Sequence, residues 1–419
     1  LTPDIRTEYI PMHSIRAPNQ KWPHTMKPFP NAESFSQMWD PETLRTSLEA
    51  IPEEYSKWIG DLENAKGGTT PDKYIDDIIL DCTKALERIT KGIDLLVGDD
   101  DARLAFCFAN KAINLQRRWN LQSQSKNVDD LDYRPFQIAF ILMTIESVLH
   151  GNSKDRNICD LLWVPTGGGK TEAYLVLVAI DMAYRRLKSI RNGQSGAGVS
   201  VFTRYTLRLL SIQQFRRSLQ IFAAAESLRV ENTGTGSLTG WRPRSCTDTK
   251  DILWGSTPFS VGLWVGDNLT PNKLESYFDG MNKGALEALK LSPEIQKQRG
   301  ISEPAQILNC PACNGILSIP NNGLAKNTSH ELNLVIRSNS TTALLNNSLN
   351  QFTHPNITID NSRTEFLELN PEYFVLKITF TSVDDTDWEQ LSGFNGLWTK
   401  LERKLISESL VSEGCLQST

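Results

Sequence analysis

Residues 159–171 read CDLLWVPTGGGKT, a short apolar run that leads directly into three consecutive glycines, a lysine and a threonine. In such a loop the backbone N–H groups can surround a phosphate, because glycine lets the backbone approach without a Cβ clash. The lysine adds positive charge near the outer phosphates, and the threonine hydroxyl binds Mg²⁺. The stretch therefore predicts a strand, a phosphate-binding P-loop and a helix that begins within the glycines.

The loop supplies the residues that we expect to bind ATP, with Thr171 as the ligand of the accompanying Mg²⁺. They are Thr166, Gly167, Gly168, Gly169, Lys170 and Thr171. The usual pattern opens with a glycine five positions before the last loop glycine, where this chain has Val164. A chance glycine turn is the alternative, but the apolar run before the loop and the helical pattern after it favour the P-loop.

Apolar and helical segments alternate around the loop. Buried strands are expected at 159–164, 199–203 and 259–266, and helices at 135–149, from the loop to about 190, and from about 205 to 230. This alternation is typical of parallel strands joined by right-handed crossovers. We therefore expect an α/β fold over residues 129–305. The Gly, Thr, Ser and Arg residues of 231–257 predict an exposed loop.

The regions on either side differ from this α/β pattern. The first 30 residues are rich in proline and predict an extended arm. Apolar residues at helical spacing predict helices over 72–97, with Thr70 as N-cap and Pro71 as first residue, and over 102–121. Residues 1–128 thus predict a helical N-terminal domain. Residues 306–419 predict a mixed α+β region with a strand at 373–380 and an amphipathic helix at about 386–410.

Composition narrows the class of protein. The chain has 39% hydrophobic and 22% charged residues, as soluble globular proteins do, and no apolar run long enough for a membrane helix. We expect no membrane association and no secretory signal. Seven mostly isolated cysteines favour a reducing, cytoplasmic environment. The net charge of −5 means that any nucleic-acid binding would use a local basic groove.

Two further elements resemble those of superfamily 2 helicases. An Arg-x-x-Gln element, Arg134 to Gln137, precedes the loop, and in that family its glutamine reads the adenine edge, since an amide both donates and accepts. The segment from Thr203 to Phe215 is similar to helicase motif Ia. A helix N-terminus with Arg204 and Arg208 would offer N–H groups and positive charge to the phosphates of a nucleic acid. The alternatives are a surface glutamine and a solvated basic helix face.

Five short sequence segments between residues 130 and 315, in this order along the chain, resemble the large helicase subunit of the DISARM phage-defence system. They are RPFQIAF (134–140), PTGGGKTEAY (165–174), RYTLRLL (204–210), VGLWVG (261–266) and CPAC (310–313). The resemblance implies a RecA-like, ATP-driven antiviral motor on single-stranded or junction DNA, with a partner defence subunit and a methyltransferase. That family is much longer than 419 residues, so we expect an N-terminal portion of the motor.

Catalytic residues for ATP hydrolysis are not identified. Hydrolysis requires an Asp-Glu pair at a strand end, and no such pair follows residue 204. Asp384 and Asp385 after the 373–380 strand are better explained as a helix cap. The alternative to a helicase or translocase is therefore an ATP-binding scaffold in a nucleic-acid complex that does not hydrolyse ATP. A small-molecule kinase would not need Gln137 or Arg204.

The Cys-x-x-Cys pair at Cys310 and Cys313 predicts half of a structural zinc site. Such a site needs four ligands, and the sequence has no second pair of this kind. Cys415, His330 and His354 are the candidates to complete it. Two reduced cysteines in a turn are the alternative.

Overall fold

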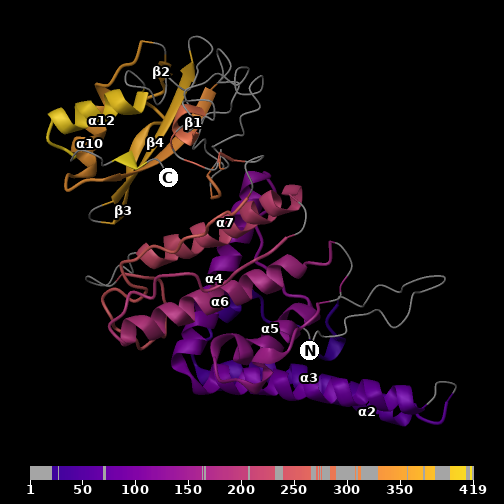
Figure 1. Cartoon of the computed structure of the whole chain (residues 1–419). Helices are drawn as coiled ribbons and strands as arrows, with labels where there is room; N and C mark the ends of the chain where they lie inside the picture. The colour runs from indigo at the N-terminus through magenta and orange to yellow at the C-terminus, as the bar shows by residue number, and fades with distance from the viewer. Residues whose placement is uncertain are drawn as a thin grey trace. The chain divides into compact units, whose positions relative to one another are not determined.

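The computed structural model describes most of the chain. The described residues are 21–26, 28–68, 72–162, 164, 167–205, 208–231, 239–265, 270–271, 273, 275, 284–288, 307, 310–312, 329–355, 357–370, 373–382, 397–411 and 416–417. They form two compact units (Figure 1). The first unit is drawn from residues 1–114, 130–188 and 242–246, and the second from 115–129, 189–241 and 247–419.

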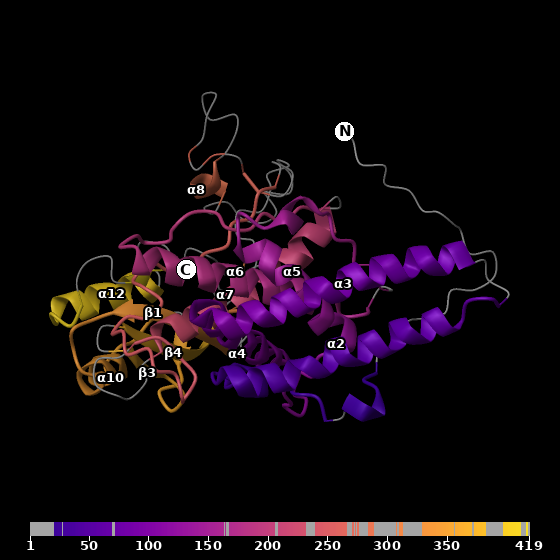
Figure 2. The same cartoon turned by 90° about the horizontal axis from the view of Figure 1, so that it is seen from below.

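Two long helices, α2 (Pro41–Asn64) and α3 (Asp72–Gly98), run side by side in the first unit (Figures 1 and 2). Their ion pairs show that they are antiparallel, because Arg45 near the start of α2 contacts Asp94 near the end of α3 at 3.0 Å. The predicted helix over 72–97 is confirmed, whereas its expected cap, Thr70 with Pro71, lies outside the described residues.

Helix α4 (Asp100–Ser123) supplies much of the core of the first unit. Its first turns are buried on all sides, as expected for a helix inside a core: Ala102, Leu104, Ala105, Phe106, Cys107, Phe108 and Ala109. Two buried asparagines further along α4 bind the segment that precedes α5 (Pro135–Leu149). Asn110 Oδ1 accepts the Tyr133 hydroxyl at 2.8 Å, and Asn114 Oδ1 accepts the Leu131 N–H at 2.9 Å. The start of α5 is therefore fixed by α4.

Helices α3 and α5 approach each other closely at Gly92. A Cβ built on Gly92 would lie 1.9 Å from the Leu142 carbonyl oxygen of α5, which is far inside contact distance. Only glycine allows this packing, so α5 is held directly against the backbone of α3.

The helices of the expected α/β alternation are present, but its parallel sheet is not found in the described part of the chain. α6 (Lys170–Arg191) and α7 (Arg208–Val230) form where expected. The described residues of 159–164, 199–203 and 259–266 form no strand. A buried parallel strand needs paired neighbours and covered faces, yet Leu161, Phe202 and Trp264 are 74%, 76% and 92% exposed. The described residues therefore show a mostly helical arrangement with an antiparallel sheet, and the parallel RecA-like sheet stays a prediction.

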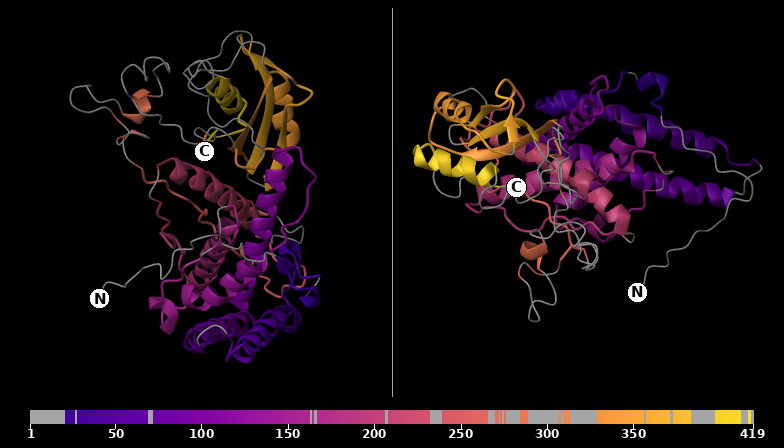
Figure 3. Two further views of the ribbon diagram at one scale, coloured as in Figure 1. Left: turned by 90° about the vertical axis from the view of Figure 1, so that its right-hand side faces the viewer. Right: turned by 90° about the horizontal axis from the view of Figure 1, so that it is seen from above.

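That sheet lies in the second unit and agrees with the expected mixed α+β region (Figures 1 and 3). It has five strands: β1 (Ser329–Arg337), β2 (Ile357–Ile359), β3 (Glu365–Asn370), β4 (Tyr373–Ser382) and β5 (Leu416–Gln417). β4 is central and pairs antiparallel with β1 along one edge, and with β2 and β3 along the other. Asp384 and Asp385, which follow β4, lie outside the described residues.

One face of this sheet is covered by α10 (Thr342–Asn350) and α12 (Leu397–Ser407). Alternate residues of β4 point into the shared core with these helices: Phe374, Leu376, Ile378 and Phe380. The period of two explains why the 373–380 strand was predictable from the sequence. The short helices are η1 (His24–Met26), α1 (Ala32–Ser36), η2 (Lys154–Asn157) and α8 (Ala285–Ala288).

Described residues of the 231–257 segment are partly buried, which corrects the expectation of an exposed loop. Trp241 and Trp254 are 6% and 0% exposed, and the Trp254 indole N–H donates to the Trp241 carbonyl at 2.8 Å. None of the described helices has the length and the apolar character needed to cross a bilayer.

Replacing Gly92 tests the contact between α3 and α5. Gly92→Ala should lower the free energy of unfolding by about 3 kcal/mol, because the methyl group collides with a backbone carbonyl that cannot rotate away. Thermal unfolding followed by far-UV circular dichroism measures the change. Gly60→Ala on α2 is the matched control, since nothing lies within 4 Å of its Cβ position. Equal unfolding midpoints for the two variants would contradict the close approach.

Candidate phosphate-binding site

The glycine loop leads directly into helix α6, as the sequence predicted. Gly167 and Gly169 have φ values of 77° and 85°, in the left-handed region that favours glycine. α6 begins at Lys170, so the N–H groups of its first turn have no partner within the helix. A helix N-terminus of this kind carries partial positive charge and attracts anions. Pro165 and Thr166, the first expected loop residues, lie outside the described residues.

Two side chains from the start of α5 hold the loop carbonyls. The Arg134 guanidinium donates to the Gly168 carbonyl, and the Gln137 amide donates to the Gly169 carbonyl at 2.7 Å. In a planar trans peptide the C=O and the next N–H point in opposite directions. Holding these two carbonyls on α5 therefore directs the N–H groups of Gly169 and Lys170 away from it. The arrangement orients two adjacent donors for an anion.

The Gln137 side chain makes contacts within the protein that the sequence did not predict. Its side chain is buried, and its Oε1 accepts the Arg134 backbone N–H at 2.8 Å, which also caps the start of α5. A Cβ on Gly169 would lie 2.8 Å from Gln137 Nε2, so the loop needs glycine there for space as well as for φ. The structure brings Gln137 against the phosphate loop. Its predicted contact with adenine stays a prediction.

Lys170 and Thr171 lie at the start of α6, half-buried. The Lys170 ammonium donates to the Val164 carbonyl just before the loop, and the Thr171 hydroxyl accepts the Tyr174 hydroxyl at 3.3 Å. An ammonium bound to a neutral carbonyl can exchange it for a phosphate oxygen, which is a stronger acceptor. The Lys170 ammonium and the Thr171 hydroxyl thus fit a phosphate group and a cation that takes oxygen ligands, respectively.

Sequence reasoning missed the role of Arg134. The Arg-x-x-Gln spacing marked both residues, but only the glutamine had an expected function. The sequence did contain a signal for this role. Pro135 is the first residue of α5, so Arg134 occupies the N-cap, and it lies on the same side of the helix as Gln137.

The arginines of the motif Ia segment belong to the second unit. Arg204 is exposed shortly before α7, and Arg208 is the first residue of that helix. Arg208 is thus at a helix N-terminus, Arg204 precedes it by four residues, and nucleic-acid binding by both stays a prediction.

The zinc prediction is not tested by the described residues. Cys310 is partly buried, whereas Cys313 and Cys415 lie outside the described part of the chain. Within the described ranges, no three His, Cys, Asp or Glu side chains gather in a way that could hold a metal ion.

Comparison with known proteins agrees with the resemblance inferred from the loop and its neighbours. No protein-family model matches this sequence. In a match 329 residues long that covers 74% of this chain, it is 31% identical to DISARM protein DrmA of Bacillus paralicheniformis. The chain spans 27% of the length of that protein. Over this stretch, the chain is a sequence relative of DISARM protein DrmA.

Proposed function

We propose that this chain binds Mg-ATP through residues 167–171, as the nucleotide-binding part of a superfamily 2 helicase or translocase in a DISARM-type antiviral defence system. The observation that supports this best is the orientation of the loop by α5, which directs the N–H groups of Gly169 and Lys170 away from Arg134 and Gln137. The relation to DISARM protein DrmA supports the defence role and a partner subunit.

Each loop residue then has a separate task. The backbone N–H groups bind phosphate oxygens, Lys170 neutralises charge on the outer phosphates, and the Thr171 hydroxyl is a ligand of Mg²⁺. Gln137 uses one N–H to hold the Gly169 carbonyl of the loop and one lone pair to accept the Arg134 N–H, and an amide has one more of each. An additional contact with the adenine edge is therefore compatible with its position.

Arg204 and Arg208 are proposed to bind the phosphates of single-stranded or junction DNA. Arg208 begins α7 and Arg204 lies four residues before it, and the first N–H groups of a helix, which have no partner within the helix, add to the positive charge of the side chains. Such contacts fix the register of a nucleic acid without reading its sequence.

A second candidate function is an ATP-binding scaffold that does not hydrolyse ATP. The observation that favours it is the lack of any Asp-Glu dipeptide in the 419 residues. Phosphate release by the purified chain, with and without single-stranded DNA, separates the two functions. Steady release that is lost in Lys170→Ala supports the motor, whereas ATP binding without release supports the scaffold.

Removal of the loop lysine should weaken nucleotide binding strongly. Lys170→Ala is expected to raise the Kd for Mg-ATP about 100-fold, because a charged hydrogen-bond donor to phosphate is lost. Titration of a fluorescent ATP derivative measures the Kd. Lys84→Ala, which removes an exposed lysine of α3, is the control and should bind normally. Wild-type affinity in Lys170→Ala would refute the P-loop assignment.

Two glycine variants separate backbone strain from crowding in the loop. Gly169→Ala should raise the Kd for Mg-ATP more than tenfold, since it adds strain of about 1–2 kcal/mol and displaces Gln137. Gly167→Ala carries the same kind of strain, but nothing lies within 4 Å of its Cβ position, so its effect should be smaller. Equal effects in the same titration would argue against the contact with Gln137.

The arginine proposal predicts a change in salt dependence. The double variant Arg204→Ala, Arg208→Ala should bind single-stranded DNA more weakly and should flatten the plot of log K against log salt by about 0.7 per lost phosphate contact. Fluorescence anisotropy over a salt series gives the slope. The exposed Arg216 of α7 offers a matched control, because Arg216→Ala should keep the wild-type slope. An unchanged slope in the double variant would mean that the two arginines face solvent only.

A further inference from the structure

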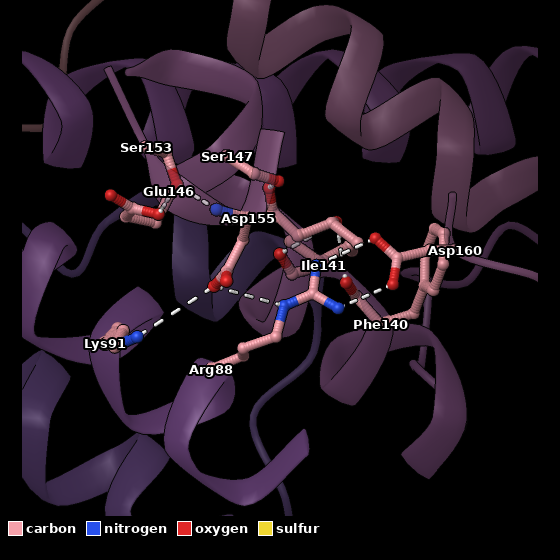
Figure 4. Close-up of polar contacts among 10 residues, drawn as sticks. Arg88, Lys91, Phe140, Ile141, Glu146, Ser147, Ser153, Asp155 and Asp160 are labelled. Atoms are coloured by element: carbon pink, nitrogen blue, oxygen red, sulfur yellow. Dashed lines mark hydrogen bonds and ion pairs between the residues drawn. The ribbon is translucent and has the colours of Figure 1, made fainter. Parts of the chain in front are cut away.

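Arg88 of α3 forms a forked ion pair with Asp160, which lies in the segment that leads to the phosphate loop (Figure 4). Nη1 donates to Oδ1 at 2.6 Å and Nη2 donates to Oδ2 at 2.8 Å. The two side chains are only 10% and 17% exposed. A fork of this kind fixes the orientation of the carboxylate as well as its position.

A second carboxylate completes the charge balance around Arg88. Asp155 Oδ2 of η2 lies 3.5 Å from Arg88 Nε and 3.9 Å from Lys91 Nζ, so two cations of α3 face two anions of the 155–160 segment (Figure 4). Hydrogen bonding to Asp160 raises the pKa of Arg88 above its ordinary value, although burial acts in the opposite direction. The guanidinium is thus charged, hydrogen-bonded to Asp160 and within ion-pair distance of Asp155.

The anchored segment is directly connected to the phosphate site. Asp160 lies four residues before Val164, whose carbonyl accepts the Lys170 ammonium. On its other side the loop is held by Arg134 and Gln137 of α5. Helix α5 itself rests on α3 at Gly92, about one turn of α3 beyond Arg88. Both the approach to the loop and its supporting helix are therefore fixed to one short stretch of α3.

We propose that Arg88 and Asp160 are positioning residues for nucleotide binding, which hold the approach to the phosphate loop against α3 in the geometry that receives ATP. The inference rests on the proposed ATP binding by residues 167–171. A preformed loop binds more tightly than one that has to be ordered on binding. An ion pair that served stability alone could be replaced by apolar side chains without loss, whereas a positioning pair depends on the direction of its hydrogen bonds.

Conservative variants test the fork without removing the side chains. Arg88→Lys retains the charge but cannot bind both carboxylate oxygens in one plane, and Asp160→Asn retains the shape but loses the charge. Each should raise the Kd for a fluorescent Mg-ATP derivative about tenfold. Amide hydrogen exchange without nucleotide should increase in peptides covering residues 158–170 and remain unchanged in α2. Reversal of the pair, Arg88→Asp with Asp160→Arg, should recover part of the affinity that either single reversal loses.

Arg45→Gln is the matched control, because it removes an ion pair between α2 and α3 that is distant in sequence from the loop approach. It should leave the Kd unchanged. If Arg88 and Asp160 variants bind as wild type while Lys170→Ala does not, the positioning role is overturned and the P-loop assignment stands. If exchange increases throughout α2 and α3 and the reversed pair recovers nothing, the pair is only structural. If all of these variants, Lys170→Ala included, bind Mg-ATP as tightly as the wild type, the proposed ATP binding itself is overturned.

Discussion

The hydrogen bonds from Arg134 and Gln137 to the carbonyls of Gly168 and Gly169 are the constraint on which the candidate site depends. They set the direction of the following N–H groups, and they require the start of α5 to stay in place. The surrounding unit meets this requirement with buried polar contacts. Asn110 and Asn114 of α4 bind the segment before α5, and the close packing on α3 holds its middle.

Local sequence signals were sufficient for α3 to α7 and for the glycine loop, whereas α2 (Pro41–Asn64) was not predicted. Caps, apolar periodicity and flanking glycines act between residues a few positions apart, so they can be read without knowledge of the fold. The glycine loop is such a local motif, and the helix after it was predicted, although it starts at Lys170, directly after the glycines rather than within them. The β4 strand was equally accessible, because one covered face imposes a period of two on Phe374, Leu376 and Ile378.

Contacts between distant residues could not be read in the same way. Short apolar runs such as 159–164 and 199–203 suit a buried strand, but strand formation depends on partners elsewhere in the chain, and the described residues supply none. The Arg88–Asp160 pair spans 72 positions and has no local signature. Trp254 was assigned to an exposed loop by the composition around it, while its burial depends on a carbonyl 13 residues away.

The contact of Lys170 with Val164 relates the contacts that hold the loop to the proposed binding of phosphate. Its ammonium binds the Val164 carbonyl, and a phosphate would compete for the same donor as a stronger acceptor. In the proposed nucleotide binding, this exchange would release the Val164 carbonyl from Lys170. Asp160, four residues before Val164, would keep its own contact with Arg88 during that exchange. Under the proposal, helix α3 would therefore remain the fixed support of the loop while Lys170 changes its hydrogen-bond partner.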